Sequence, residues 1–269
     1  MKNKKQEQKE KEKEKNKKKK INEKNNNNIN NNDNEENEIE EEYDPKIFPK
    51  QIILFDYFLD ISSSLKYIDL VFLLDSTASM NCYSKDINKI ILKIIHDLEK
   101  ALSKFFFEEI DVLKIGIVTY KDHEDEEKTY LTNIETDLTS DIKNIKNILM
   151  NIQYIGGKDE PEAVLDGLNT VLTEINWRKN STKFLVHILD APCHGKKYHN
   201  LEGDKIENCP KNLIYEDVLG NLRKKGINYF VIKINDTIDL MIQEFKKIID
   251  IEISKPEINM DKNKILKQD

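Results

Sequence analysis

The sequence predicts an α/β fold: a doubly wound, mostly parallel sheet with helices on both faces, preceded by a disordered tail. Two observations lead to this fold class. Nearly continuous apolar runs at 68–74 and 184–189 are each followed by Asp, and strand-like segments alternate with helix-like segments along the chain. Such runs are typical of parallel strands that are buried on both faces of a sheet.

The chain divides into four parts by composition. Residues 1–42 hold 12 Lys, 11 Glu, 1 Asp and 12 Asn, and so few apolar groups cannot offset the entropy lost on folding. The rest of the chain is long enough for one domain with a full core. We therefore predict a low-complexity charged and Asn-rich tail at 1–42, a linker at 43–66, one domain at 67–250 and a polar C-terminal tail at 251–269.

Apolar spacing defines the elements of the first half of the domain. Residues 68–74 read as a central strand, and 87–102 repeat Ile and Leu every three or four residues, as one face of a helix does. Residues 112–120 are a second β-rich apolar run, and the short segment 128–132 predicts an edge strand. Residues 141–152 again show the helical spacing.

The second half of the domain begins after Gly156-Gly157, which interrupts the chain. Asp159 is a suitable N-cap for the next helix, with an acid three residues later and Pro161 in the first turn. The run at 184–189 is the next strand, and a long polar connection follows it. The remaining predicted elements are a helix at 213–225, a strand at 228–234 and a helix at 238–249.

The turn after the first strand offers several oxygen ligands close together. Asp75, Thr77 and Ser79 alternate along this turn, so their oxygens can converge. Asp190 ends another central strand, and sites in open parallel sheets form outside the carboxyl ends of strands. Carboxylates and hydroxyls suit Mg²⁺, Mn²⁺ or Ca²⁺. The alternative is that Asp-Ser-Thr only caps the first helix.

This Asp-x-Thr-x-Ser pattern resembles the metal-ion-dependent adhesion site of von Willebrand factor A (vWA) domains, and Asp190 resembles the late metal aspartate of that family. Segments 120–124, 156–163 and 190–195 resemble the vWA domains joined to α-type protein kinases in protists. The resemblance covers most of 67–250. It implies a Rossmann-like sheet with the metal at its top and a role in protein binding without catalysis.

The resemblance also implies roles for individual residues. Thr77 and Ser79 would ligate the ion directly, while Asp75 and Asp190 would often act through water. A family Thr that completes integrin-like sites is absent from 155–162, where Asp159 is the nearest substitute. Its alternative role is the helix cap described above.

Other polar groups are weaker candidates. Cys193, His194, His199 and Cys209 are zinc-ligand types within one loop, but no C-x-x-C pair is present, which favours a polar surface loop. His123 lies among acids, either as a second cation site or in a solvated acidic loop.

Composition and charge argue against several classes of protein. The net charge of −7 disfavours a nucleic-acid partner, no apolar run approaches the length of a transmembrane segment, and three Cys make no disulfide framework. We predict a cytoplasmic, non-catalytic, metal-dependent protein-binding module whose partner supplies an acidic residue to the ion. The residues after the last strand are too few for a kinase domain.

Two alternatives stay open. One is a regulatory or targeting partner of an α-type serine/threonine kinase. The other is a metal-dependent phosphohydrolase that uses Asp75 with a basic residue at the same rim, for which Lys85, Lys121 and Lys158 are candidates.

Overall fold

The sheet of this protein is known from a computed structural model, which describes residues 67–103, 111–125, 128–202, 204 and 206–254. The predicted tail at 1–42 and linker at 43–66 lie outside these residues. The described part contains six strands in one sheet. They are β1 (Ile68–Asp75), β2 (Leu113–Tyr120), β3 (Thr132–Thr139), β4 (Thr182–Leu189), β5 (Ile227–Lys233) and β6 (Ile251–Ser254).

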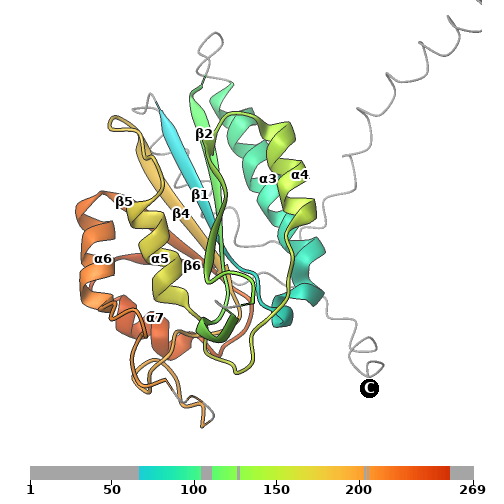
Figure 1. The fold of residues 1–269 in the computed structure, drawn as a ribbon. Helices are drawn as coiled ribbons and strands as arrows, with labels where there is room; N and C mark the ends of the chain where they lie inside the picture. Colours follow the sequence, from blue (N-terminus) through green and yellow to red (C-terminus); the bar gives the residue numbers. More distant parts are fainter. Residues whose placement is uncertain (1–66, 104–110, 126–127, 203, 205, 255–269) are drawn as a thin grey trace, which may run out of the picture. The chain divides into compact units, whose positions relative to one another are not determined.

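The strand order is β3-β2-β1-β4-β5-β6, as the doubly wound prediction requires. Every neighbouring pair is parallel except β2 and β3, which are antiparallel. Because β1 lies between β2 and β4, the loops that follow these three strands meet at one edge of the sheet (Figure 1). Leu74 pairs with Ile188, so Asp75 and Asp190 end neighbouring strands.

Helices cover both faces of this sheet (Figure 1). One face carries α3 (Ser84–Leu102) and α4 (Ile142–Asn151), and the other carries α5 (Val164–Thr173), α6 (Tyr215–Lys224) and α7 (Asp239–Phe245). No helix among the described residues has the length and apolar character needed to cross a membrane. Two short 3₁₀ turns, η1 (Ala78–Tyr83) and η2 (His123–Asp125), follow β1 and β2.

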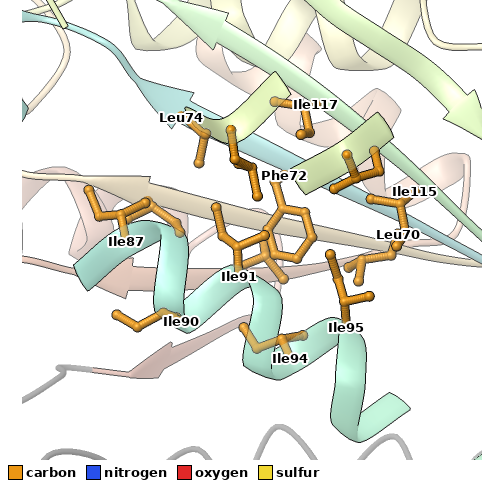
Figure 2. Packing of buried hydrophobic residues seen from close by; sticks show 14 of the residues in the cluster. Leu70, Phe72, Leu74, Ile87, Ile90, Ile91, Ile94, Ile95, Ile115 and Ile117 are labelled. Carbon is orange, nitrogen blue, oxygen red and sulfur yellow. The ribbon is translucent and has the colours of Figure 1, made fainter. Parts of the chain in front are cut away.

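Strand β1 shows how the core is divided between the two faces. Because side chains alternate along a strand, Leu70, Phe72 and Leu74 face α3, while Val71 and Leu73 join the cluster under α5. Figure 2 shows Phe72 enclosed by the Ile side chains of α3 and by residues of β2. Each fully buried side chain of this size contributes about 1.5–3 kcal/mol, so β1 anchors both layers.

His187 lies in the middle of β4 with no exposed surface, as predicted for a core residue. Its Nε2 lies 2.9 Å from the Tyr120 hydroxyl and its Nδ1 lies 2.8 Å from the Tyr229 hydroxyl. Burial lowers the pKa of His187 to about 3. The imidazole is therefore neutral in the folded protein at neutral pH.

Three predicted boundaries are wrong. The edge strand is not 128–132 but β3, where Ile134 and Leu138 pack against the core from an otherwise polar segment. The polar tail does not begin at residue 251, because Ile251–Ser254 form β6 and pair with β5. Helix α5 begins at Val164, so Asp159 does not cap it.

Candidate metal centre

The loop after β1 brings its acid and hydroxyls together. The Thr77 backbone N–H and hydroxyl both donate to Asp75 Oδ1, at 3.0 and 2.6 Å. The hydroxyl of Ser79 lies 3.2 Å from that of Thr77 and donates to Asp190 Oδ1 at 3.1 Å. Four of the five predicted site residues therefore converge at the carboxyl edge of the sheet.

The helix-cap alternative for this loop fails. Thr77 is the residue before η1, but its side chain makes no capping hydrogen bond. Its hydroxyl is directed to Asp75 instead. The side-chain oxygens of this loop are thus gathered around Asp75. The local turn contact here is the hydrogen bond that the Thr77 backbone N–H donates to Asp75.

Glu162 is a third carboxylate at this cluster, and sequence reasoning missed it. A Cβ placed on Gly157 would lie 2.8 Å from Glu162 Oε1 and 3.1 Å from Thr77 Cβ, so the Glu162 carboxylate and Thr77 flank the same glycine. Gly157 has a φ of +73°, which a residue with a Cβ adopts only under strain. The sequence places this acid in a predicted helix start, which gives no signal that its carboxylate reaches the cluster.

The backbone explains why Glu162 points into the site. Its N–H donates to Pro192 O at 2.9 Å, and Glu162 forms an isolated parallel bridge with Cys193. The next N–H, of Ala163, donates to Lys121 O at 3.0 Å. These bonds hold residue 162 in an extended segment between the loops after β2 and β4, before α5 begins.

Two oxygens of the cluster lack a hydrogen bond. Asp75 Oδ2 and Glu162 Oε2 are buried, and no described residue donates to them. Burial and then the charge of Asp190 raise the pKa of Asp75 to about 7. Burial and then Asp75 raise the pKa of Glu162 well above its usual value, and burial also raises the pKa of Asp190.

Keeping these buried carboxyl groups charged costs free energy unless a cation compensates their charge. Buried charges in proteins are paired or coordinate metal ions, and here the three acids face two hydroxyls and one another. Carboxylate and hydroxyl oxygens are the donors that Mg²⁺, Mn²⁺ and Ca²⁺ prefer. The residues present therefore fit a divalent cation of this class.

Of the three basic residues predicted as candidates at the rim, Lys85 is exposed, and Lys121 and Lys158 are each bound by other groups. Lys121 has no exposed surface, and its Nζ donates to the carbonyl oxygens of Ser76, Gln153 and Ile155 at 2.8, 3.1 and 2.6 Å. Lys158 is exposed and pairs with Glu124 at 2.7 Å. Lys121 is thus a structural tie between the loop after β1 and the segment after α4.

Asp159 belongs to a different group from the one predicted. One ligand atom each from Asp122, Asp159 and His194 lie within 4.8 Å of one another. Burial and then the charge of Asp122 raise the pKa of Asp159. Within the acidic segment, Glu162 rather than Asp159 takes the place next to Thr77.

The first part of the predicted polar surface loop, up to residue 199, is largely buried, whereas its described residues from 200 to 214 are half-buried or exposed. Cys193, His194 and His199 are 2%, 5% and 3% exposed, and Cys193 packs in the core under α5. The Cys209 thiol donates to Asp166 Oδ2 at 3.4 Å. Among the described residues the four zinc-ligand types therefore form no common group, since His194 and Cys209 belong to two different clusters of ligand atoms.

The acidic loop after β2 is also not the solvated loop that was predicted. Asp122 and Asp125 are 0% and 5% exposed. Asp125 Oδ2 accepts a hydrogen bond from the Gly157 N–H at 2.7 Å, and His123 lies 3.2 Å from Asp166. The acids are drawn inward because they bind groups of the neighbouring loops.

The fold is a doubly wound α/β module with carboxylate and hydroxyl oxygens gathered at the carboxyl edge of its sheet. The model of the von Willebrand factor type A domain matches residues 69–256, and the chain belongs to this family. The match extends past residue 250 and so includes β6.

Comparison with known proteins gives one curated relative and several structures. The chain is 31% identical over 201 residues to "Alpha-protein kinase vwkA" of Dictyostelium discoideum; the aligned region is 71% of this chain and 29% of that protein. Proximal thread matrix protein 1 of the mussel byssus, in a structure described as having a zinc-occupied MIDAS motif, is 15% identical, with a TM-score of 0.49 over 74% of this chain and 44% of that chain. BatB of Bacteroides thetaiotaomicron is 14% identical, with a TM-score of 0.46 over 71% and 91% of the two chains.

Proposed function

We propose that the chain is a non-catalytic protein-binding module whose partner docks at a divalent cation. Asp75, Thr77, Ser79, Asp190 and Glu162 would hold the ion. The observation that supports this most directly is the pair of buried oxygens without hydrogen bonds, Asp75 Oδ2 and Glu162 Oε2, at the same cluster. Membership in the von Willebrand factor type A family agrees with it.

A bound ion of this kind would supply an electrophilic docking point for an acidic group of the partner. The carboxylate of Glu162 would lower the net positive charge of this docking point. Three carboxylates around one divalent ion strengthen ion binding but leave little positive charge for a partner's carboxylate. We therefore expect tight ion binding together with modest selectivity for acidic partners, in contrast to a site with fewer acids.

The test is calorimetric titration of the full chain with Mg²⁺ and Ca²⁺, which the carboxylate and hydroxyl oxygens of this site suit. Asp75→Asn keeps the shape of the buried side chain, and Asp217→Ala removes an exposed acid from α6 as a matched control. We expect saturable binding in the wild type and the control, and loss of binding in Asp75→Asn. Unchanged binding in Asp75→Asn, or none in the wild type, would overturn the proposed ion site.

The partner-binding half of the proposal needs a second measurement. Proteins captured by the wild type should be released by chelator and should not bind Asp75→Asn. Capture that survives both treatments would mean that the module binds partners through another surface.

The three cysteines are free thiols, which agrees with our placement of the protein in the cytoplasm.

A kinase-associated role is the second candidate. The Dictyostelium relative carries the name of an α-protein kinase, and the aligned region is 29% of its length. The chain would then be a regulatory or targeting module that acts with an α-type kinase. Co-purification that yields no such kinase would argue against this role.

A phosphohydrolase is the least supported alternative. Lys121 lies close enough for its charge to lower the pKa of Asp75, but three carbonyl oxygens bind its ammonium group. Turnover of a generic phosphoester that Asp75→Asn abolishes would restore this alternative.

A further inference from the structure

A second cluster of ligand atoms lies outside the centre described above. Asp122 follows β2, Asp159 lies in the segment before α5, and His194 follows β4. One ligand atom from each lies within 4.8 Å of the other two. Residues far apart in the sequence thus meet because the loops after neighbouring strands share one edge of the sheet.

The two acids of this cluster lack part of their hydrogen bonding. Asp122 has no exposed side-chain surface, and its Oδ2 accepts no hydrogen bond from any described residue. Asp159 Oδ1 is likewise buried and without a partner in the described chain. An unsatisfied buried carboxylate oxygen costs several kcal/mol unless a charge compensates it. Two such oxygens at one place point to a cation.

His194 is held with one nitrogen toward these acids. Its Nε2 lies 3.0 Å from Asp122 Oδ1, and its Nδ1 lies 3.0 Å from Asp204 Oδ1. Metal-binding histidines commonly donate the N–H of one ring nitrogen to a carboxylate, which fixes the tautomer and directs the other nitrogen at the metal. Asp204 provides that second contact here.

Asp204 is itself firmly positioned. It accepts the backbone N–H groups of Gly195 and Ile206, each at 2.8 Å, and lies 3.0 Å from His199 Nε2. The side chains of His194, His199 and Asp204 are 3%, 1% and 2% exposed. The orientation of His194 is therefore built into the loop and does not depend on solvent.

We propose that Asp122, Asp159 and His194 Nε2 bind a second divalent cation of the zinc or manganese type. Two carboxylates and one imidazole form a mixed oxygen and nitrogen donor set, which suits first-row transition ions rather than Mg²⁺ or Ca²⁺. Asp204 is the positioning residue for His194. The competing interpretation is a closed ion bridge in which a proton on His194 Nε2 takes the place of the metal.

A neighbouring group must be distinguished from this site. His123, Asp166 and Cys209 also place ligand atoms within 4.8 Å of one another, and the rings of His123 and His194 are 5.5 Å apart. The two groups differ chemically, because only the neighbouring one contains a thiol. Cobalt bound by a thiolate gives a charge-transfer band in the near ultraviolet, whereas cobalt bound by oxygen and nitrogen gives only weak visible bands.

The experiment titrates the full chain with Zn²⁺ by calorimetry and with Co²⁺ by absorption spectroscopy, in the Asp75→Asn background. This background removes the first centre, so failure of one site does not obscure the other. Asp159→Asn is the main variant because Asp159 is half-buried and the amide keeps the shape of its side chain. Glu160→Gln, an exposed acid next to it, is the matched control.

We expect one equivalent of Zn²⁺ to bind, Asp159→Asn and His194→Gln to weaken binding at least tenfold, and Glu160→Gln to leave it unchanged. Asp204→Asn should weaken it by 10- to 100-fold, as for other outer-shell partners. The absence of Zn²⁺ binding, or binding that Asp159→Asn leaves unchanged, would overturn the site in favour of the proton bridge. A thiolate band that Cys209→Ser removes would overturn it in favour of the neighbouring group.

Discussion

Lys121 is predicted to hold the metal-binding loop and the segment after α4 together. Its ammonium group is buried among three backbone carbonyl oxygens, and burial lowers its pKa. Lys121→Met keeps most of the aliphatic stem but removes the charge and all three hydrogen bonds. The variant therefore measures how much this buried cation stabilises the fold.

The magnitude follows from the bonds that remain. Ser76 O still accepts the N–H of Ile155 at 3.1 Å, so Lys121→Met leaves that oxygen satisfied. Gln153 O and Ile155 O lose their charged donor. A buried acceptor left without a donor costs about 1–3 kcal/mol, but Gln153 and Ile155 are exposed residues whose carbonyls water can partly reach, so we expect a total loss of about 1–3 kcal/mol in the free energy of unfolding. That is a large share of a typical domain stability of about 5–15 kcal/mol.

Urea unfolding of the full chain, followed by far-ultraviolet circular dichroism, measures this loss at constant m-value. Lys158→Met is the control, because Lys158 is 52% exposed and forms only a surface pair with Glu124. Such pairs contribute about 0–1 kcal/mol. A loss below about 1 kcal/mol for Lys121→Met, or one equal to the control, would refute the assigned role of Lys121.

Three further predictions follow from single residues. Because the pKa of buried His187 is about 3, the unfolded chain takes up a proton below pH 6.5 that the folded chain does not. Between pH 7 and 5 the wild type should therefore lose about 2 kcal/mol of unfolding free energy relative to His187→Gln, which shares every other titrating group. An unchanged difference between the two proteins would contradict the buried neutral imidazole. Gly156→Ala should lower the free energy of unfolding by about 2–4 kcal/mol in thermal or urea unfolding, since φ is +91° and the new Cβ would lie 2.2 Å from Asp125 Oδ2. Gly226→Ala, whose new Cβ would have nothing within 4 Å, should lower it by about 1 kcal/mol from backbone strain alone. Equal losses in the two variants would contradict the steric argument. Glu162→Gln should weaken Mg²⁺ binding more than tenfold in calorimetry, and an unchanged affinity would remove Glu162 from the ion site.

The sequence was sufficient for the layered fold because local patterns carry that information. The apolar run of β1 and the three- and four-residue spacing of α3 are properties of neighbouring residues, so burial and helix periodicity can be read directly. Asp75, Thr77 and Ser79 lie within five residues of one another and were predicted to converge for the same reason. Asp190 could be added because the ends of parallel strands share an edge.

Edge elements were harder to predict because little of their surface is buried. All residues of β3 are half-buried, and its pairing with β2 shifts register near Ile117. Strand β6 has only four residues, and two of them are exposed. Weak burial leaves weak sequence patterns, so the sequence predicts the edge strand too early in the chain and a polar tail where β6 lies.

The sequence by itself determined the strand-helix alternation, the parallel sheet and the acid-hydroxyl loop after β1, because each depends on residues close together in the chain. Only the tertiary structure decided which loop acids meet. Glu162 and Asp159 are three residues apart, yet backbone bonds to the loops after β2 and β4 send Glu162 toward Thr77, while Asp159 meets Asp122 and His194. Such contacts depend on strand order and loop path over tens of residues, which no local pattern encodes.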